Sequence, residues 1–463
     1  MGRDLSTVRY YDSILQTIGR TPLVRLNKVT KNVRGLILAK VEYFNPGGSV
    51  KDRIALSIIE EAEQGGRLKP GGTIVESTSG NTGMGLALVA AVKGYKTVFT
   101  VPDKMSTEKI SLLRAFGAEV IVTPTAVPHE SPESYTEVAK AIVRERPNSI
   151  LANQYYNPKN PDSHYATTGP EIWKQTDGKI DYFVCGIGTG GTISGAGKFL
   201  KEMNPNIKVI GIDPKGSVLS EYFYTKKISP VLKTYKVEGI GQDYIPGVLN
   251  FECIDDVIEV TDKESFLMAR RLTKEEGLMA GGSSGTAVAG MLKIADRFKQ
   301  DDLIVVLLPD SGERYISKIY NDDWMREYGF LIPEKITARY VLQAKGQKVN
   351  GLVAVQPTTT IREALALIKD HDISQLPVLE SSHSVGAVHD YELMTAVMED
   401  PGRLASAVQS MMGPSFPIVN TESHIEDVIR LMTPKKNSAV LVEENQKLSG
   451  IITRYDVVEF MGK

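Results

Sequence analysis

The sequence predicts an α/β protein in which two doubly wound open sheets are followed by a smaller α/β module built from a repeat. Short apolar runs alternate with amphipathic helical segments from residue 12 to about residue 330, as in doubly wound folds. Several of these runs are uninterrupted, which is typical of parallel strands covered on both faces. Near the C-terminus the chain repeats itself, because Ile361 and Gly386 recur as Ile425 and Gly450 at one offset of 64 residues.

The composition limits the classes of function. At 463 residues the chain is long enough for more than one domain, and a net charge of −2 gives no reason to expect a nucleic-acid partner. The two cysteines have no metal-ligand cluster around them, so neither a disulfide scaffold nor a metal site is expected, and Cys185 is assigned to core packing. The polar N-terminus and the lack of a membrane-length apolar run predict a cytoplasmic protein acting on small molecules.

The alternation places the individual elements of the first part of the chain. Strands are expected at Leu36–Val41, Thr73–Glu76, Thr97–Val101, Val120–Thr123, Ile150–Ala152, Tyr182–Ile187, Val209–Ile212 and Leu303–Leu308. Helices are expected at Ile54–Gln64, Thr82–Lys93, Glu108–Phe116, Pro132–Glu145 and Ile193–Met203.

The domain boundaries follow from changes in this pattern. Residues 1–330 are expected to form a catalytic region of two subdomains, the smaller spanning roughly residues 45–155. Residues 331–340 read as a linker. Residues 341–463 contain the tandem repeats, at about 341–400 and 405–463, each predicted to run helix, strand, turn, strand, helix.

The segment NPGGSVKDR, residues 45–53, contains the first candidate catalytic residue. It lies between a predicted strand and a predicted helix, which puts Lys51 near a helix N-terminus. The positive end of the helix dipole disfavours a second positive charge there, and burial would lower the lysine pKa further. Most lysines are solvated surface residues, but a lysine held in this field is a usable amine nucleophile.

A second segment, ESTSGNTGMG at residues 76–85, also joins a strand to a helix. Its hydroxyl side chains and free backbone N–H groups favour an anion site, with a carboxylate as the natural guest. An ordinary helix N-cap would need one such hydroxyl, and this turn offers four together with an asparagine.

A third segment, CGIGTGGT at residues 185–192, is a glycine-rich turn suited to phosphate. Gly186, Gly188 and Gly191 satisfy the dinucleotide pattern GxGxxG, and Asp213 ends the next predicted strand, so the motif alone permits an NAD enzyme. The threonines of the turn instead suit a terminal phosphate monoester. An NAD enzyme would also leave Lys51 without a role.

Two further turns, AGGSSG at residues 280–285 before a helix from Thr286, and LPDSG at residues 308–312, are weak signals alone. Taken together, an activated lysine, a phosphate cup and a carboxylate loop favour pyridoxal phosphate acting on an amino acid.

On these motifs, residues 12 to about 330 resemble the fold type II, tryptophan synthase β-like pyridoxal-phosphate enzymes. Within that family the cystathionine β-synthase branch is the most similar, and the cysteine synthase branch comes next. Residues 331–463 resemble paired CBS repeats, the adenosyl-sensing modules that accompany this branch.

The resemblance implies roles for individual residues. It makes Lys51 the Schiff-base lysine, Asn81 the residue at the cofactor ring, and Ser283 the residue facing the pyridine nitrogen. The substrate carboxylate would be held by Ser77, Thr78, Ser79, Thr82 and Gln154. The cofactor phosphate would be held by Gly188, Thr189, Gly190, Gly191 and Thr192.

Ser283 has a chemical implication of its own. A hydroxyl cannot keep the pyridine nitrogen protonated as a carboxylate would, so the ring is a weaker electron sink. That favours β-elimination, in which the leaving group carries electrons away, over transamination.

The resemblance implies condensation of L-serine with L-homocysteine to give cystathionine and water, with Lys51 removing and returning the Cα proton. The segment VEGIGQDYIP, residues 237–246, favours the cystathionine branch, although Gln242 stands where many members have tyrosine. Few residues precede Ile14, so no haem is expected. A cysteine synthase or sulfide-producing enzyme is the near alternative, and a non-catalytic adenosyl-nucleotide sensor is the alternative of another class.

Relatives of this fold are dimers, so a homodimer or larger homo-oligomer is expected. In ligand-binding CBS repeats a strand ends in a glycine-hydrophobic-x-Thr/Ser-x-x-Asp pattern. The second copy keeps it with Thr453 and Asp456, whereas the first has His389 and Glu392 at those positions. One adenosyl site is therefore expected, for S-adenosylmethionine or an adenine nucleotide, with a purely structural module as the alternative.

Overall fold

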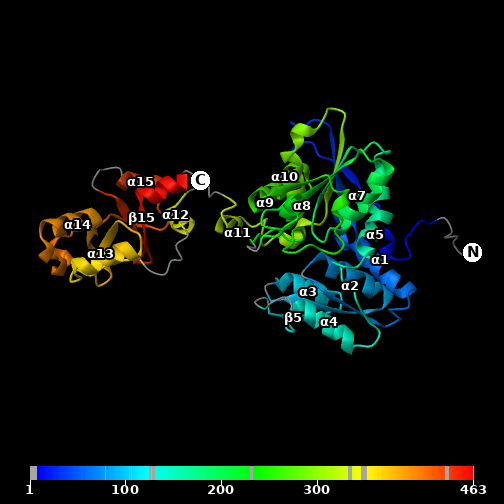
Figure 1. Ribbon diagram of the computed structural model, residues 1–463, viewed down its shortest axis with the longest axis horizontal. Coiled ribbons are helices and arrows are strands. Elements are labelled where there is room, and N and C mark those ends of the chain that lie inside the picture. The colour runs from blue at the N-terminus through cyan, green and yellow to red at the C-terminus, as the bar shows by residue number, and fades with distance from the viewer. Residues whose placement is uncertain are drawn as a thin grey trace, which may run out of the picture. The chain divides into compact units, whose positions relative to one another are not determined.

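The computed structural model describes residues 8–78, 80–103, 105, 107–124, 127, 131–229, 233–331, 336–345, 352–432 and 437–461. By its internal contacts the chain divides into two compact units, Met1–Phe330 and Leu331–Lys463, which are described separately. The predicted α/β class is confirmed, since both units combine sheets with covering helices (Figure 1).

The larger sheet of the first unit has six strands in the order β1-β2-β10-β7-β8-β9, with β1 antiparallel to β2 and the other neighbours parallel. Its central strand β10 is the uninterrupted apolar run LIVVLL, as expected for a strand covered on both faces. The prediction missed β1, which has three residues, and β9, which carries two acidic residues. The strands are β1 (Leu23–Arg25), β2 (Leu36–Val41), β7 (Tyr182–Gly186), β8 (Lys208–Pro214), β9 (Asp256–Val260) and β10 (Leu303–Leu308).

The smaller sheet has four parallel strands in the order β5-β4-β3-β6. Figure 1 shows α2, α3 and α4 gathered around it in the blue and cyan part of the ribbon. Helix α1 (Lys51–Gln64) buries Ile54, Ile58 and Ile59 in the same apolar cluster as Phe99 of β4. The elements are β3 (Thr73–Ser77), β4 (Lys96–Pro102), β5 (Glu119–Thr123), β6 (Ser149–Leu151), α2 (Asn81–Lys93), α3 (Thr107–Ala115) and α4 (Tyr135–Glu145).

Several helices begin earlier than the sequence predicted. Helix α1 begins at Lys51 rather than Ile54, α7 at Gly191 rather than Ile193, and α10 at Gly282 rather than Thr286. In each case the first turn is made of polar residues or glycine, so the apolar periodicity starts one turn late. The remaining helices of this unit are α5 (Lys159–Ala166), α6 (Thr168–Gln175), α7 (Gly191–Met203), α8 (Leu219–Thr225), α9 (Asp262–Arg271), α10 (Gly282–Lys293) and α11 (Asp322–Glu327).

The second unit confirms the predicted repeat of helix, strand, turn, strand and helix. Its two hairpins shift register at the same place, between Val378 and Leu379 in the first and between Val442 and Glu443 in the second. The duplication therefore extends to a local irregularity of the strands. The elements are α12 (Ala338–Ala344), α13 (Ile361–Asp370), β11 (Gln375–Glu380), β12 (His383–His389), α14 (Asp390–Glu399), β13 (Ile418–Asn420), α15 (Ile425–Met432), β14 (Ala439–Glu444), β15 (Lys447–Thr453) and α16 (Arg454–Met461).

Within the described ranges, no helix is long and apolar enough to cross a bilayer. The same ranges contain no group of three or more His, Cys, Asp or Glu side chains that could hold a metal ion. Cys185 and Cys253 are both free thiols and both buried, and Cys185 belongs to an apolar cluster, as predicted.

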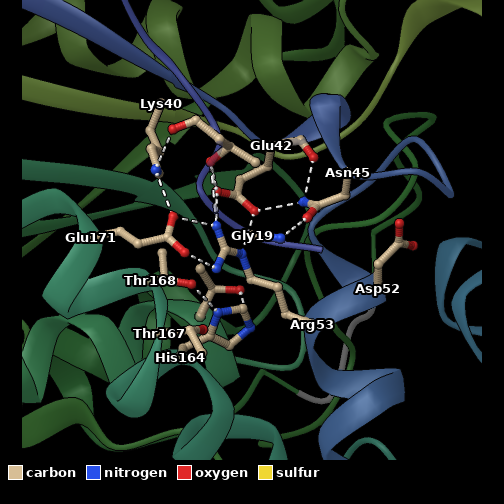
Figure 2. Close-up of polar contacts among 12 residues, drawn as sticks. Gly19, Lys40, Glu42, Asn45, Asp52, Arg53, His164, Thr167, Thr168 and Glu171 are labelled. Carbon is tan, nitrogen blue, oxygen red and sulfur yellow. Dashed lines mark hydrogen bonds and ion pairs between the residues drawn. The ribbon is translucent and has the colours of Figure 1, made fainter. Parts of the chain in front are cut away.

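A buried ion cluster ties α1 to β2 and α6 (Figure 2). The Arg53 guanidinium donates to both oxygens of Glu42 at 2.7 and 2.9 Å and to both oxygens of Glu171 at 2.8 Å. The Lys40 ammonium donates to Glu171 at 2.9 Å, so two cations face two carboxylates. Burial opposes ionisation of Glu171, but Arg53 and Lys40 outweigh it and lower the pKa of this carboxyl to about 2.

Substituting Arg53→Met should destabilise the first unit by about 3–5 kcal/mol, because it leaves two buried carboxylates without their shared partner. Thermal unfolding followed by near-ultraviolet circular dichroism measures the loss. Arg271→Met is the matched control, since it removes an arginine from an exposed pair with Glu275 and should leave the midpoint nearly unchanged. Equal midpoints for the two variants would contradict this account of the cluster.

Candidate active site

A cavity of about 400 Å³, a size typical of small-molecule sites, collects most of the predicted site residues. A second cavity of about 20 Å³ shares Lys51 and Thr189 with it and is lined by the glycine-rich turn. Ser79 lies outside the described residues. The predicted residues that line one or both cavities are Lys51, Ser77, Thr78, Asn81, Thr82, Gln154, Gly188, Thr189, Gly190, Thr192 and Ser283.

Lys51 is the first residue of α1, at the positive end of the helix dipole. The turn before it is fixed by the Val50 N–H, which donates to the Pro309 carbonyl at 2.8 Å, and by a β-bridge between Ser49 and Asp310. Burial lowers the pKa of Lys51, and the neighbouring Cys185 and Asp310 only partly oppose that shift. The site therefore favours the neutral amine that a nucleophile and proton acceptor needs.

Asp310 is a buried carboxylate that joins three parts of the site. It accepts hydrogen bonds from Asn81 Nδ2 at 2.8 Å, from the Tyr315 hydroxyl at 2.6 Å, and from Ser283 Oγ at 3.5 Å. Asn81 Oδ1 also accepts from the Arg314 guanidinium, so both ends of this amide are held. Asn81, predicted to lie at the cofactor ring, and Ser283, predicted to face the pyridine nitrogen, are thus both hydrogen-bonded to Asp310.

The predicted carboxylate loop lies between the end of β3 and the start of α2. Thr82 Oγ1 donates to Gln154 Oε1 at 2.5 Å, which brings together two residues 72 positions apart. Glu76 accepts from the backbone N–H groups of Asn153 and Gln154 at 2.6 and 3.3 Å. Burial raises the pKa of Glu76 to about 7, and these N–H groups limit the rise. The segment carrying Gln154 is therefore held beside the loop.

The glycine-rich turn fits a phosphate group. Gly190 adopts φ +86°, which glycine tolerates without strain, and the 13-residue helix α7 starts at the next residue. A Cβ atom on Gly191 would lie 1.9 Å from Asn160 Oδ1, so this close approach requires glycine. Thr189 Oγ1 accepts from Asn160 Nδ2 at 3.0 Å and from the Gly191 N–H at 3.3 Å. The N–H groups in the first turn of α7 and the Thr189 hydroxyl are suitable donors to an anion.

The sequence prediction missed several cavity residues, among them Lys109 and Tyr155, whereas Glu238 and Gln242 belong to the segment 237–246 that it singled out. Glu238 forms ion pairs with Lys109 of α3 and with Lys318, the latter at 2.6 Å, and so links the part around the smaller sheet to the part around the larger one. Tyr155 and Gln242 also line this cavity. Neither lysine stands in a motif, and only the acidic loop around Glu238 gave a signal in the sequence.

In the second unit, Thr453 and Asp456 lie together at the end of β15. The Thr453 N–H and hydroxyl donate to Asp456 Oδ2, both at 2.7 Å, and the Asp456 N–H donates back to Thr453 Oγ1 at 3.2 Å. This reciprocal pattern is a capping box at the start of α16. Lys345 Nζ also donates to Asp456 Oδ2, at 2.8 Å. The adjoining cavity, about 20 Å³, has room for about one water molecule.

The first repeat lacks this arrangement. Glu392 accepts instead from the Tyr391 hydroxyl at 3.0 Å, and His389 makes no side-chain cap at the start of α14. The two copies therefore share a fold but differ at the position expected to bind a ligand.

Comparison with known proteins identifies the family. The model of pyridoxal-phosphate dependent enzymes matches residues 14–310, and the CBS domain model matches residues 349–399 and 408–463. The chain is 44% identical over 466 residues to a cystathionine beta-synthase of Dictyostelium discoideum, covering 98% of this chain and 92% of that protein. This chain belongs to the cystathionine beta-synthase family of pyridoxal-phosphate dependent enzymes.

Other relatives match the catalytic part of this family alone. A cysteine synthase of Staphylococcus aureus is 46% identical over 312 residues, which are 66% of this chain and 96% of the relative. The solved structure of a hydrogen sulfide-producing enzyme from Fusobacterium nucleatum superposes with a TM-score of 0.61 at 38% identity, over 66% of this chain and 100% of that one. Membership of a pyridoxal-phosphate family decides against the dinucleotide interpretation of the glycine motif.

Substituting Lys51→Ala should abolish the visible absorbance of the lysine-bound cofactor in the purified protein. Activity should fall by about 10²–10⁴-fold, which is the usual contribution of a general base. The matched control is Lys198→Ala, which removes an exposed lysine of α7 and should change neither quantity. A persisting visible band in the Lys51 variant would show that another residue holds the cofactor.

Proposed function

We propose that the protein condenses L-serine with L-homocysteine to give L-cystathionine and water in a pyridoxal-phosphate dependent β-replacement. The observation that carries this proposal is the likeness of the whole chain, catalytic region and paired repeats together, to proteins named cystathionine beta-synthase. The cavity of about 400 Å³, with a lysine at its wall and hydroxyl groups on the loops around it, supports the proposal.

In this proposal each part of the site holds one part of the reacting group. The cofactor supplies an electron sink that acidifies the Cα proton of an amino acid joined to it. Lys51 would attach the cofactor, Thr189 and Thr192 would donate to its phosphate, and Ser283 would face its pyridine nitrogen. Asp310 keeps Ser283 and Asn81 in place through its hydrogen bonds.

Lys51 has a second task once an amino acid occupies the site. Its pKa is lowered by burial, so Nζ has a lone pair to take the Cα proton from bound serine and return it at the end of the reaction. The loop from Ser77 to Thr82 would hold the serine carboxylate during both proton transfers. Thr82 is itself held by Gln154, which restricts how that carboxylate can lie.

The decisive measurement compares kcat/KM for serine with homocysteine against kcat/KM for O-acetylserine with sulfide. We expect the first pair to be favoured by about tenfold or more, as contacts with the larger second substrate allow. The reverse order would contradict the proposed reaction and would leave the family assignment intact.

The reverse order is also what a second candidate function predicts, namely a cysteine synthase or sulfide-producing β-replacement enzyme. The 46% identity to a cysteine synthase over the catalytic part supports this candidate. Gln242 supports it as well, because it lines the cavity at a position where many members of the cystathionine β-synthase branch have tyrosine.

For the second unit we propose an adenosyl site at Thr453 and Asp456, for S-adenosylmethionine or an adenine nucleotide. Asp456 Oδ2 already accepts from Thr453 and from Lys345, and the neighbouring cavity is too small for a nucleoside. A ribose that bonds to Asp456 Oδ2 would therefore have to displace the Lys345 ammonium. Regulation further requires tighter binding to one state of the enzyme, with a coupling of about 1–3 kcal/mol.

Substituting Lys345→Met should tighten adenosyl binding by about tenfold, equivalent to about 1.4 kcal/mol, because the competing ammonium is gone. Calorimetric titration with S-adenosylmethionine, AMP and ATP measures this, and Lys369→Met in the first repeat is the control for loss of an exposed lysine. Unchanged affinity in the Lys345 variant would refute the displacement step. Failure of both proteins to bind any of the three compounds would show that Thr453 and Asp456 serve only as a helix cap.

We also propose a homodimer or larger homo-oligomer in the cytoplasm. The oligomer is proposed because relatives of the resembled fold are dimers. The cytoplasmic location is proposed because the chain has only two cysteines.

A further inference from the structure

The glycine-rich turn at residues 185–192, with its threonines Thr189 and Thr192, is called the phosphate cup below. Helix α5 presents two side chains to the start of α7, and each contacts one of these two threonines. Asn160 Nδ2 lies 3.0 Å from Thr189 Oγ1, and His164 Nε2 lies 3.2 Å from Thr192 Oγ1. Asn160 and His164 are four residues apart, so they lie on one face of α5, and both are fully buried. A single helix face therefore contacts both hydroxyls of the cup.

The two helices approach so closely that this contact has little freedom. A Cβ atom on Gly191 would lie 1.9 Å from Asn160 Oδ1, and one on Gly195 would lie 2.0 Å from the Pro161 carbonyl oxygen. Any side chain at these two positions of α7 would push α5 away. The glycines thus keep the positions of Thr189 and Thr192 tied to α5.

Counting donors fixes the direction of the Thr189 hydroxyl. A hydroxyl has one proton to donate and two lone pairs that accept. Thr189 Oγ1 already accepts from Asn160 Nδ2 and from the Gly191 N–H, so both lone pairs are used. Its proton remains to be donated into the cavity that Thr189 lines.

The same count applies to His164, whose Nδ1 lies 2.9 Å from Thr168 Oγ1 (Figure 2). Burial lowers the pKa of His164 well below its usual range, and the charge of Arg53 lowers it further, so one ring nitrogen donates and the other accepts. If Nδ1 donated, the buried Thr168 hydroxyl would keep its proton without a recorded acceptor among the described residues. Satisfying that hydroxyl requires it to donate to Nδ1.

With Nδ1 accepting, Nε2 carries the ring proton and donates it to Thr192 Oγ1. The Thr192 hydroxyl is then free to donate its own proton elsewhere. The opposite tautomer would use up the Thr192 proton on His164 and present only lone pairs to the cup. Since a phosphate oxygen accepts hydrogen bonds, only the first arrangement favours it.

We propose that His164 and Asn160 are positioning residues, which direct the hydroxyl protons of Thr192 and Thr189 into the cup so that it accepts a phosphate monoester. The chain Thr168 to His164 to Thr192 sets one of these protons, and the Asn160 amide sets the other. This inference rests on the proposed assignment of the cup to the cofactor phosphate.

Two polar substitutions that differ by one methylene group test the role of His164. The amide of His164→Gln reaches the Nε2 position and can still donate to Thr192, whereas the amide of His164→Asn reaches only the Nδ1 position. The affinity of the apoprotein for pyridoxal phosphate, followed by fluorescence, should fall by about tenfold in His164→Asn, as expected for one lost hydrogen bond. His164→Gln should bind within about threefold of the unsubstituted protein, because the contact to Thr192 is kept.

A double-mutant cycle with Thr192→Ala makes the readout specific. Once Thr192 lacks its hydroxyl, His164→Asn should cause little further loss of affinity. The ³¹P resonance of the bound cofactor should shift in His164→Asn and in Thr192→Ala, and should stay in place in His164→Gln. Thr30→Val is the control for loss of a buried hydroxyl, because in the described chain the Thr30 hydroxyl bonds only to the Leu26 carbonyl.

The outcomes separate the two levels of the proposal. Unchanged affinity in Thr192→Ala would show that the cup does not hold the cofactor phosphate. Weaker binding in Thr192→Ala combined with full affinity in His164→Asn would overturn the positioning role alone. Additive losses in the double variant would also overturn it, since coupling between the two residues is what the hydrogen-bond chain requires.

Discussion

The arrangement of this site depends on one buried carboxylate, Asp310. It follows the central strand β10 and accepts from Asn81, Ser283 and Tyr315, while its backbone bridges to Ser49, two residues before Lys51. These partners come from four separate segments of the chain. A buried carboxylate is costly unless it is hydrogen-bonded, so the site is stable only when all four segments have reached their places. The Asp310 carboxylate therefore has its full set of hydrogen bonds only when the site is completely assembled.

The polar groups around Lys51 follow a consistent electrostatic pattern. The buried ion cluster described above contains two cations, Lys40 and Arg53, and two carboxylates, Glu42 and Glu171. It therefore adds no net charge near Lys51. His164 is neutral, and burial raises the pKa of the Cys185 thiol to about 12. In this setting a neutral Lys51 amine is the less costly state, and an anionic phosphate is the group best able to use the donors of the cup.

Much of the fold and of the site could be predicted from the sequence because the signals are local. The apolar runs predicted β2 and β10 to the residue, and the turns around Lys51, Thr82 and Thr189 are contiguous motifs. Residues such as Lys109 and His164 could not be predicted, because they reach the site through contacts between segments more than 20 residues apart. Thr453 and Asp456 were found from a local pattern, but that pattern does not decide their function. The same residues at the same spacing suit both a ribose contact and a helix cap.

The central position of β10 has a consequence for synthesis on the ribosome. This strand pairs with β2 on one side and β7 on the other, and its register joins Leu303 to Leu36, positions separated by more than half of the chain. Until β10 has emerged, β2 and β7 each present an unpaired edge, and such edges promote misassociation. Long-range parallel pairing is also slow because a large loop must close first. The nascent first unit is thus expected to stay incomplete until nearly all of its residues have left the exit tunnel.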